Sequence, residues 1–156
     1  MSTQTDVDPL IEAEAEGILA DALASATSAR LSHYREVGTE ETRKRLRALL
    51  DVTSASIRTR DVAPVVAYAE EVARSRFAEG FRLQELQTAV NVLEEAIWNR
   101  IVSRLPPSEM AEALGLVSTV LGIAKDWFGS TFVALATEGA RTSLDLRSLF
   151  RGTQGF

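Results

Sequence analysis

Residues 76–100 read RFAEGFRLQELQTAVNVLEEAIWNR, and this stretch decides the fold. An apolar pattern of helical period runs up to Phe77, stops at Gly80 and restarts as a stripe of aliphatic residues, namely Leu83, Leu86, Val90, Leu93, Ile97 and Ile101. Steps of three and four residues place that stripe on one face of a helix. Glycine ends a helix cheaply, because it adopts a left-handed backbone without a side-chain clash. We therefore predict two helices that meet at a corner made by Gly80.

The rest of the chain also has the pattern of helices, and no segment alternates like a strand. Asp8 before Pro9 is typical of a helix start. The apolar faces and the breaks between them predict one long or once-broken helix that ends at Gly38, a second from Thr39 through Ile57, a third from Asp61 to Phe77, a fourth from Leu83 to Pro106, and a fifth from Glu109 to at least Leu135. The chain is thus expected to be all-α.

Length and composition indicate one globular domain. A chain of 156 residues, of which 46% are hydrophobic and 25% charged, can bury a substantial core. It has no cysteine, which excludes disulfides and thiol chemistry. Residues 1–8 lack the basic start and apolar run of a signal peptide, and no run of about 18 apolar residues occurs. We expect a disordered tail over residues 1–8 and a cytoplasmic protein that does not contact membranes.

The fifth predicted helix carries more apolar surface than one buried face needs. Its seam runs through Met110, Leu114, Val117, Leu121, Ala124, Phe128, Thr131 and Leu135, and it is widened by Ala113, Val120, Trp127 and Phe132. Such a helix has to be covered on two sides, either within a monomeric bundle or by a second copy of the chain. Gly115, Gly122 and Gly129 recur every seven residues, as packing notches do. The candidate dimer interface consists of Leu121, Ala124, Phe128, Phe132 and Leu135.

The sequence offers little support for an enzyme active site. His33 is the only histidine, which leaves no histidine set for a metal or di-iron centre. Ser32 precedes it, but adjacent side chains on a helix diverge, so a serine–histidine pair is not favoured. Glycine-rich phosphate-binding motifs are absent. We predict no catalytic residue, no metal ligand and no cofactor.

Other roles for His33 remain open as alternatives. A haem-ligating histidine in globins comes after several helices, whereas His33 stands near the end of the first. Histidine phosphotransfer needs an accessible imidazole beside lysine or small residues, and no lysine or glycine flanks His33. An ordinary helix histidine is the favoured interpretation, with a haem- or small-ligand-binding sensor and a phosphotransfer-like bundle as alternatives.

Charges are distributed unevenly. The second predicted helix and the residues just after it are basic, with Arg43, Lys44, Arg45, Arg47, Arg58 and Arg60, whereas the region before it is acidic, with Asp6, Asp8, Glu12, Glu14, Glu16, Asp21 and Glu36. A nucleic-acid site would place aromatic residues beside the basic ones, and this helix has none. The net charge of −5 also gives no general attraction to nucleic acid. We expect the acidic and basic helices to attract one another, within a chain or between subunits.

The glycine corner resembles a known family. Gly80-Phe81-x-Leu83-x-Glu85-Leu86, followed by a helix that ends near Ile97-Trp98, is similar to the N-terminal sensory domain of RsbR-type stressosome proteins, the RsbRD N-terminal domain family. The likeness extends from about Ile18 to Leu135. It includes His33-Tyr34-Arg35 and the acidic helix start Glu40-Glu41.

That resemblance implies a non-haem, globin-like bundle of about five to seven helices with a long C-terminal helix. It also implies homodimers built around the last long helices, and a signalling partner of the STAS-domain or kinase type. The implied function is a sensor or adaptor of stress signalling that relays a signal through its last helix. Relatives usually carry this domain upstream of a STAS or other effector domain, so we expect either a stand-alone regulator or one excised domain.

Two further groups of side chains are candidate sites. Phe77, Phe81, Trp98 and Trp127 form a candidate apolar pocket, although aromatic residues at helical spacing usually belong to a core. Leu146, Leu149 and Phe150 share one face of a short helix, which suits docking on a partner or folding back onto the protein's own dimer. The sensor domain is then expected to cover residues 9–138, and residues 139–156 a helical extension.

Overall fold

The computed structural model describes the backbone of residues 7–29 and 32–151, and the side chains of residues 7–29 and 35–139. Six helices make up the described chain: α1 (Val7–Ser28), α2 (Ser32–Val37), α3 (Thr39–Thr59), α4 (Ala63–Ala78), α5 (Leu83–Arg104) and α6 (Pro107–Arg151). The described residues contain no strand. The prediction of an all-α fold with a long C-terminal helix is therefore confirmed.

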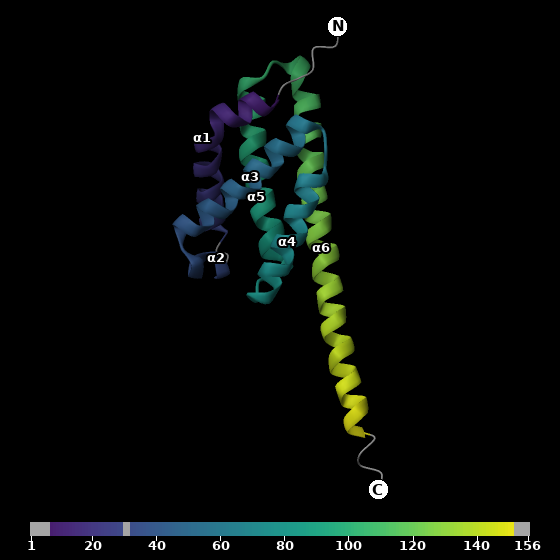
Figure 1. Ribbon diagram of the computed structural model, residues 1–156. Coiled ribbons are helices and arrows are strands. Elements are labelled where there is room, and N and C mark those ends of the chain that lie inside the picture. Colours follow the sequence, from purple (N-terminus) through teal and green to yellow (C-terminus); the bar gives the residue numbers. More distant parts are fainter. Residues whose placement is uncertain (1–6, 30–31, 152–156) are drawn as a thin grey trace.

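The helices pack as a bundle around α5 (Figure 1). One side of α5 contacts α1 and another contacts α6, while α4 lies along α6 and α3 crosses from α1 towards α4. Helix α6 continues far beyond the ends of the other helices (Figure 1). This helix therefore belongs to the core over its first part and leaves the bundle over its second.

The first helix begins earlier than the sequence pattern suggested. Val7 and Asp8 were expected in a disordered tail, but both lie in α1, and Val7 is 1% exposed. Val7 joins the apolar face of α1, while Asp8 accepts a hydrogen bond from Ser54 and pairs with Arg58 at 3.5 Å. The tail expectation was wrong at these two residues, because burial of Val7 extends the helix. Residues 1–6 lie outside the described part.

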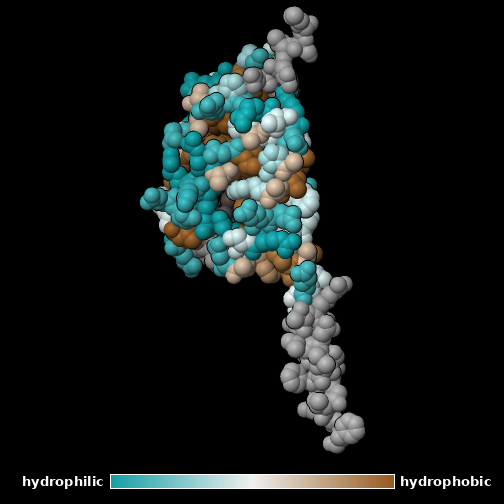
Figure 2. Space-filling model, in the orientation of Figure 1, coloured by the Kyte–Doolittle hydropathy of each residue, from teal (hydrophilic) through white to brown (hydrophobic). Residues whose placement is uncertain are grey.

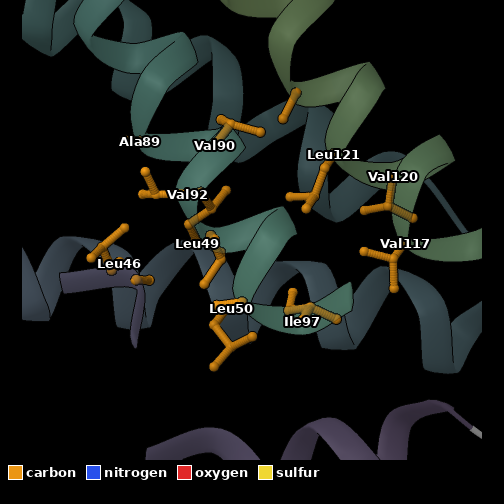
Figure 3. Packing of buried hydrophobic residues seen from close by; sticks show 14 of the residues in the cluster. Leu46, Leu49, Leu50, Ala89, Val90, Val92, Ile97, Val117, Val120 and Leu121 are labelled. Carbon is orange, nitrogen blue, oxygen red and sulfur yellow. The ribbon is translucent and has the colours of Figure 1, made fainter. Parts of the chain in front are cut away.

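The core is continuous across five helices. The aliphatic stripe predicted on α5 is buried from Leu86 through Ile101, with Leu83 partly buried at its start. Figure 3 shows the stripe meeting Leu46, Leu49 and Leu50 from α3 and Val117, Val120 and Leu121 from α6. Because buried apolar surface is the largest stabilising contribution to a fold, this contact region fixes the positions of α3, α5 and α6.

The chain turns sharply at Gly80, as the sequence predicted. Gly80 has φ 87°, a left-handed conformation that favours glycine. The Gly80 N–H donates to the Phe77 carbonyl at 3.1 Å, and the Phe81 N–H donates to the Arg76 carbonyl at 2.9 Å. This pair of bonds is the Schellman arrangement that satisfies the last carbonyls of a helix. At the start of α5, the Glu85 carboxylate accepts the Arg82 backbone N–H at 2.9 Å.

Ion pairs join the acidic α1 to its neighbours within one chain, which confirms the expected attraction. Glu16 pairs with Arg43 and with Arg47 on α3. Glu14 pairs with Arg100 and Arg104 on α5 at 3.2 and 3.1 Å, and Asp21 also reaches Arg100 at 3.0 Å. The Arg100–Glu14 contact is an ion pair without hydrogen-bond alignment, since Arg100 Nε has no hydrogen-bond partner. The more exposed of these pairs, between Glu16 and α3, add little stability individually, but all of them select neighbours for α1.

The corner yields a stability prediction. Gly80→Ala should lower the free energy of unfolding by about 1–2 kcal/mol, because a β-carbon is disfavoured in the left-handed conformation. The control is Gly139→Ala, a helical position whose added β-carbon would meet no atom within 4 Å and which should show no loss. Urea unfolding followed by circular dichroism measures both variants. Equal stability of Gly80→Ala and the wild type would contradict the prediction.

Candidate functional site

A charged cluster surrounds the aromatic ring at the Gly80 corner. Arg45 of α3 and Arg76 of α4 place their guanidinium carbons 5.5 and 5.8 Å from the centre of the Phe81 ring. The Glu79 carboxylate lies between the two arginines, 3.7 Å from Arg45 Nη2 and 3.3 Å from Arg76 Nη1. Cation–π attraction and the shared carboxylate thus hold α3 and the end of α4 together.

Both arginine side chains are largely removed from water. Only 16% of the Arg45 side chain and 14% of the Arg76 side chain are exposed. Arg45 Nε donates to Glu41 at 3.1 Å, but Arg45 Nη1 is buried and has no hydrogen-bond partner. Burying a hydrogen-bond donor without an acceptor costs free energy, and such donors are rare in native proteins. The cluster therefore holds an unused capacity to bind an acceptor.

A small cavity of about 30 Å³ adjoins the cluster between α3, α4, α5 and α6. Its polar lining comes from Arg45, Arg76 and Tyr68, and its apolar lining from Leu46, Leu49, Val72, Leu86, Ala89, Val90 and Phe128. This volume accommodates one or two water-sized groups. The site thus combines two guanidinium groups at its rim with an apolar interior, a pattern suited to a small amphipathic anion.

The four residues of the predicted aromatic pocket do not line one common pocket. Phe77 packs edge-on against Phe132, with ring centres 5.4 Å apart, and Phe81 lies under the two arginines. Trp98 and Trp127 are each 39% exposed, on α5 and α6 respectively. Phe81 alone of the four belongs to the corner cluster. The aromatic residues that line the cavity are Tyr68 and Phe128, and the sequence pattern had placed Phe128 in the candidate dimer interface.

The candidate dimer residues of α6 face the protein's own core. Leu121, Ala124 and Phe128 are at most 3% exposed, and Phe132 is 8% exposed. Leu135 is partly buried and lines a hollow between α4 and α6 together with Trp127. In this fold the first four residues are therefore covered by the protein's own core.

A different surface of α5 and α6 remains open. Trp98 and Val102, four residues apart on α5, are 39% and 56% exposed. On α6 the residues Gly115, Ser118, Gly122, Lys125 and Gly129 follow one another by three or four, and β-carbons built on the three glycines would meet no atom within 4 Å. Lys125 donates to Asn91 of α5 at 3.2 Å, which places the two stripes side by side. We call this surface the α5–α6 face.

One carboxylate on the α5–α6 face is perturbed. Partial burial raises the pKa of Glu94 above its ordinary value, and the nearby Lys125 opposes that shift. Glu94 lies four residues before Trp98, so it borders the exposed apolar side chains. The face therefore combines apolar groups with an ionisable pair.

Several sequence-derived candidates lie outside the described side chains. They are His33 and the tail residues Leu146, Leu149 and Phe150, although the backbone of α6 is helical through Arg151. Within the described part of the chain, no group of three or more acidic, histidine or cysteine residues has the arrangement of a metal site. None of the helices described there is both long and apolar enough to cross a membrane.

Fold and site together define an all-α domain with a long projecting helix. A family model described as the RsbT co-antagonist protein rsbRD N-terminal domain matches residues 17–148, and the chain belongs to this family. Searches among curated proteins and among solved structures found no match. Membership places the chain among regulatory sensor domains of the stressosome type.

The perturbed carboxylate gives a pH prediction. Because the folded pKa of Glu94 is raised, the folded state binds this proton more readily than the unfolded state, and stability falls as pH rises from the unfolded to the folded pKa. Glu94→Gln should therefore raise the free energy of unfolding at pH 7, by less than about 1 kcal/mol because solvent still screens this partly buried group. The gain should shrink as pH falls below the ordinary glutamate pKa.

Urea unfolding at several pH values measures this effect, with the exposed neighbour Glu95→Gln as control. A loss of stability in Glu94→Gln at pH 7 would show that the Lys125 interaction outweighs burial.

Proposed function

We propose that this domain is a homodimeric, non-haem sensor or adaptor of stress signalling that relays changes at the Gly80 corner through α6. The observation that carries the proposal is the double role of α6. Its first part is packed in the core against α4 and α5, while its second part continues past the bundle (Figure 1). A rearrangement of the core that shifts the first part of α6 therefore also moves the part that extends beyond the bundle.

The path from the corner to α6 is short. Phe77 lies three residues before Gly80, and its ring packs edge-on against Phe132 of α6. Rings in this geometry attract each other beyond simple burial, so a shift of the end of α4 acts on α6 at this contact. Figure 2 shows hydrophobic residues gathered where α6 leaves the bundle. The corner cluster and the projecting helix are thus linked through Phe77 and Phe132.

The α5–α6 face supports homodimerisation better than the seam suggested by the sequence. It presents two large exposed apolar side chains beside three glycine notches, which permit close approach of helices. A twofold axis across this face would bring Trp98 of each copy towards the glycine stripe of the other. It would also place the two α6 helices near each other, so that one rearrangement moves both.

The output partner in this proposal is a protein of a signalling pathway, of the STAS-domain or kinase type, which is the expectation for this family. Leu146, Leu149 and Phe150 are the proposed docking residues, since their spacing in the sequence is that of one helical face. The domain then regulates through binding and shape change. In this proposal it works in the cytoplasm, without a cofactor or a chemical step of its own.

Two equally exposed tryptophans provide a matched test of the dimer. Trp98→Glu should weaken the dimer at least about 100-fold, because a buried unpaired charge costs about 3–5 kcal/mol. Trp127→Glu alters a side chain with the same exposed fraction, 39%, on the other flank of α6, and it should remain dimeric. Light scattering coupled to size-exclusion chromatography measures both variants at micromolar concentration. A monomeric wild type, or equal dissociation of both variants, would contradict the proposed interface.

A further inference from the structure

We propose that the Gly80 corner is a binding site for a short-chain monocarboxylate, and that Glu79 occupies this site in the structure described here. The proposal rests on the proposed sensor function and names the chemical class of its ligand. It draws on three observations: a pair of mostly buried arginines, a donor without a partner, and a small apolar cavity beside them.

The arginines provide more donors than their neighbours accept. Each guanidinium carries five N–H donors in a planar fork that matches a carboxylate. Arg45 uses Nε on Glu41 and approaches Glu79 only at 3.7 Å, beyond a good hydrogen bond, while its buried Nη1 has no partner. Arg76 Nη1 is shared between Ser75 and Glu79, each at 3.3 Å. A better-placed carboxylate would gain hydrogen bonds that Glu79 does not make.

Glu79 is placed as a replaceable internal ligand. It is the residue directly before the left-handed Gly80, and 41% of its side chain is exposed to solvent. Its other contact is a hydrogen bond accepted from Ser75 at 3.1 Å. Since its side chain reaches water, Glu79 can leave the arginines without becoming a buried unpaired charge.

Charge and size select the ligand class. Arg45 and Arg76 face two carboxylates, Glu41 and Glu79, so exchange of Glu79 for another monoanion leaves the local charge balanced. A dianion such as phosphate would add uncompensated negative charge. The adjoining cavity of about 30 Å³ is lined mainly by aliphatic groups and holds about two small groups. A carboxylate with a tail of one or two carbons, as in acetate and propionate, fits these limits.

Ligand exchange would act on the output helix. Exchange of Glu79 for the ligand replaces a carboxylate attached to the end of α4 by a free one between Arg45 of α3 and Arg76 of α4, beside the corner that joins α4 to α5. Phe77, two residues before Glu79, packs on Phe132 of α6. Binding of the carboxylate is therefore coupled to the position of α6 relative to α4.

Titration of the full chain with sodium propionate tests the proposal, with sodium chloride at equal ionic strength as reference. Isothermal calorimetry and amide chemical shifts report binding. Glu79→Gln removes the competing carboxylate and should tighten propionate binding about tenfold or more, whereas Arg45→Gln and Arg76→Gln should each weaken it by a similar factor. Two arginine variants are used so that misfolding of one, visible by circular dichroism, does not decide the result.

The matched controls are Glu70→Gln and Arg74→Gln, an exposed ion pair at 3.3 Å on the same helix, which should leave propionate binding unchanged. Propionate binding no tighter in Glu79→Gln than in the wild type would overturn the proposal, as would unchanged binding in both arginine variants. Tighter binding of phosphate or octanoate than of propionate would overturn the ligand class. The dimer measured by light scattering does not depend on these outcomes, so failure of ligand binding is distinguishable from failure of the sensor proposal.

Discussion

The reversal of the chain at Gly80 is the constraint on which the rest of the structure depends. A left-handed residue at this point ends α4 and, three residues later, starts α5, and both of these helices pack against α6. The corner therefore sets the spacing between the two helices that cover the longest one. A change at the corner that moves either helix must be accommodated along α6, because tightly packed interiors transmit strain.

Much of the fold could be predicted from the sequence because helix signals are local. Gly38, Gly80 and the Pro106–Pro107 pair marked helix ends, and the aliphatic stripe from Leu86 to Ile101 proved to be the buried face of α5. The second predicted helix starts at Thr39, and the structure places Gly38 at the N-cap of α3 with no side-chain cap bond. Glycine and proline positions thus predicted where the helices end, but not which residue stands at the N-cap.

The candidate sites were harder to predict because they depend on neighbours distant in sequence. Periodicity shows that Leu121, Ala124 and Phe128 share a face, but it cannot show whether the same chain or a second copy covers that face, and here the same chain does. The corner cluster joins Arg45 to Glu79 across 34 residues (79 minus 45) and two helices. The arginines of α3 stand in a sequence pattern typical of a solvent-facing helix. That pattern did not indicate that the Arg45 side chain would be mostly buried.

The central claim is that the Gly80 corner and α6 move together within a dimer, and a distance between the two α6 helices tests it most directly. The chain has no cysteine, so Ala136→Cys, an exposed position on α6, takes a single spin label per copy. Pulsed electron spin resonance should detect one distance between the two copies, and that distance should shift when Glu79→Gln is added but not when Glu70→Gln is added. Absence of any distance between copies, or the same distance distribution in all three proteins, would contradict the account.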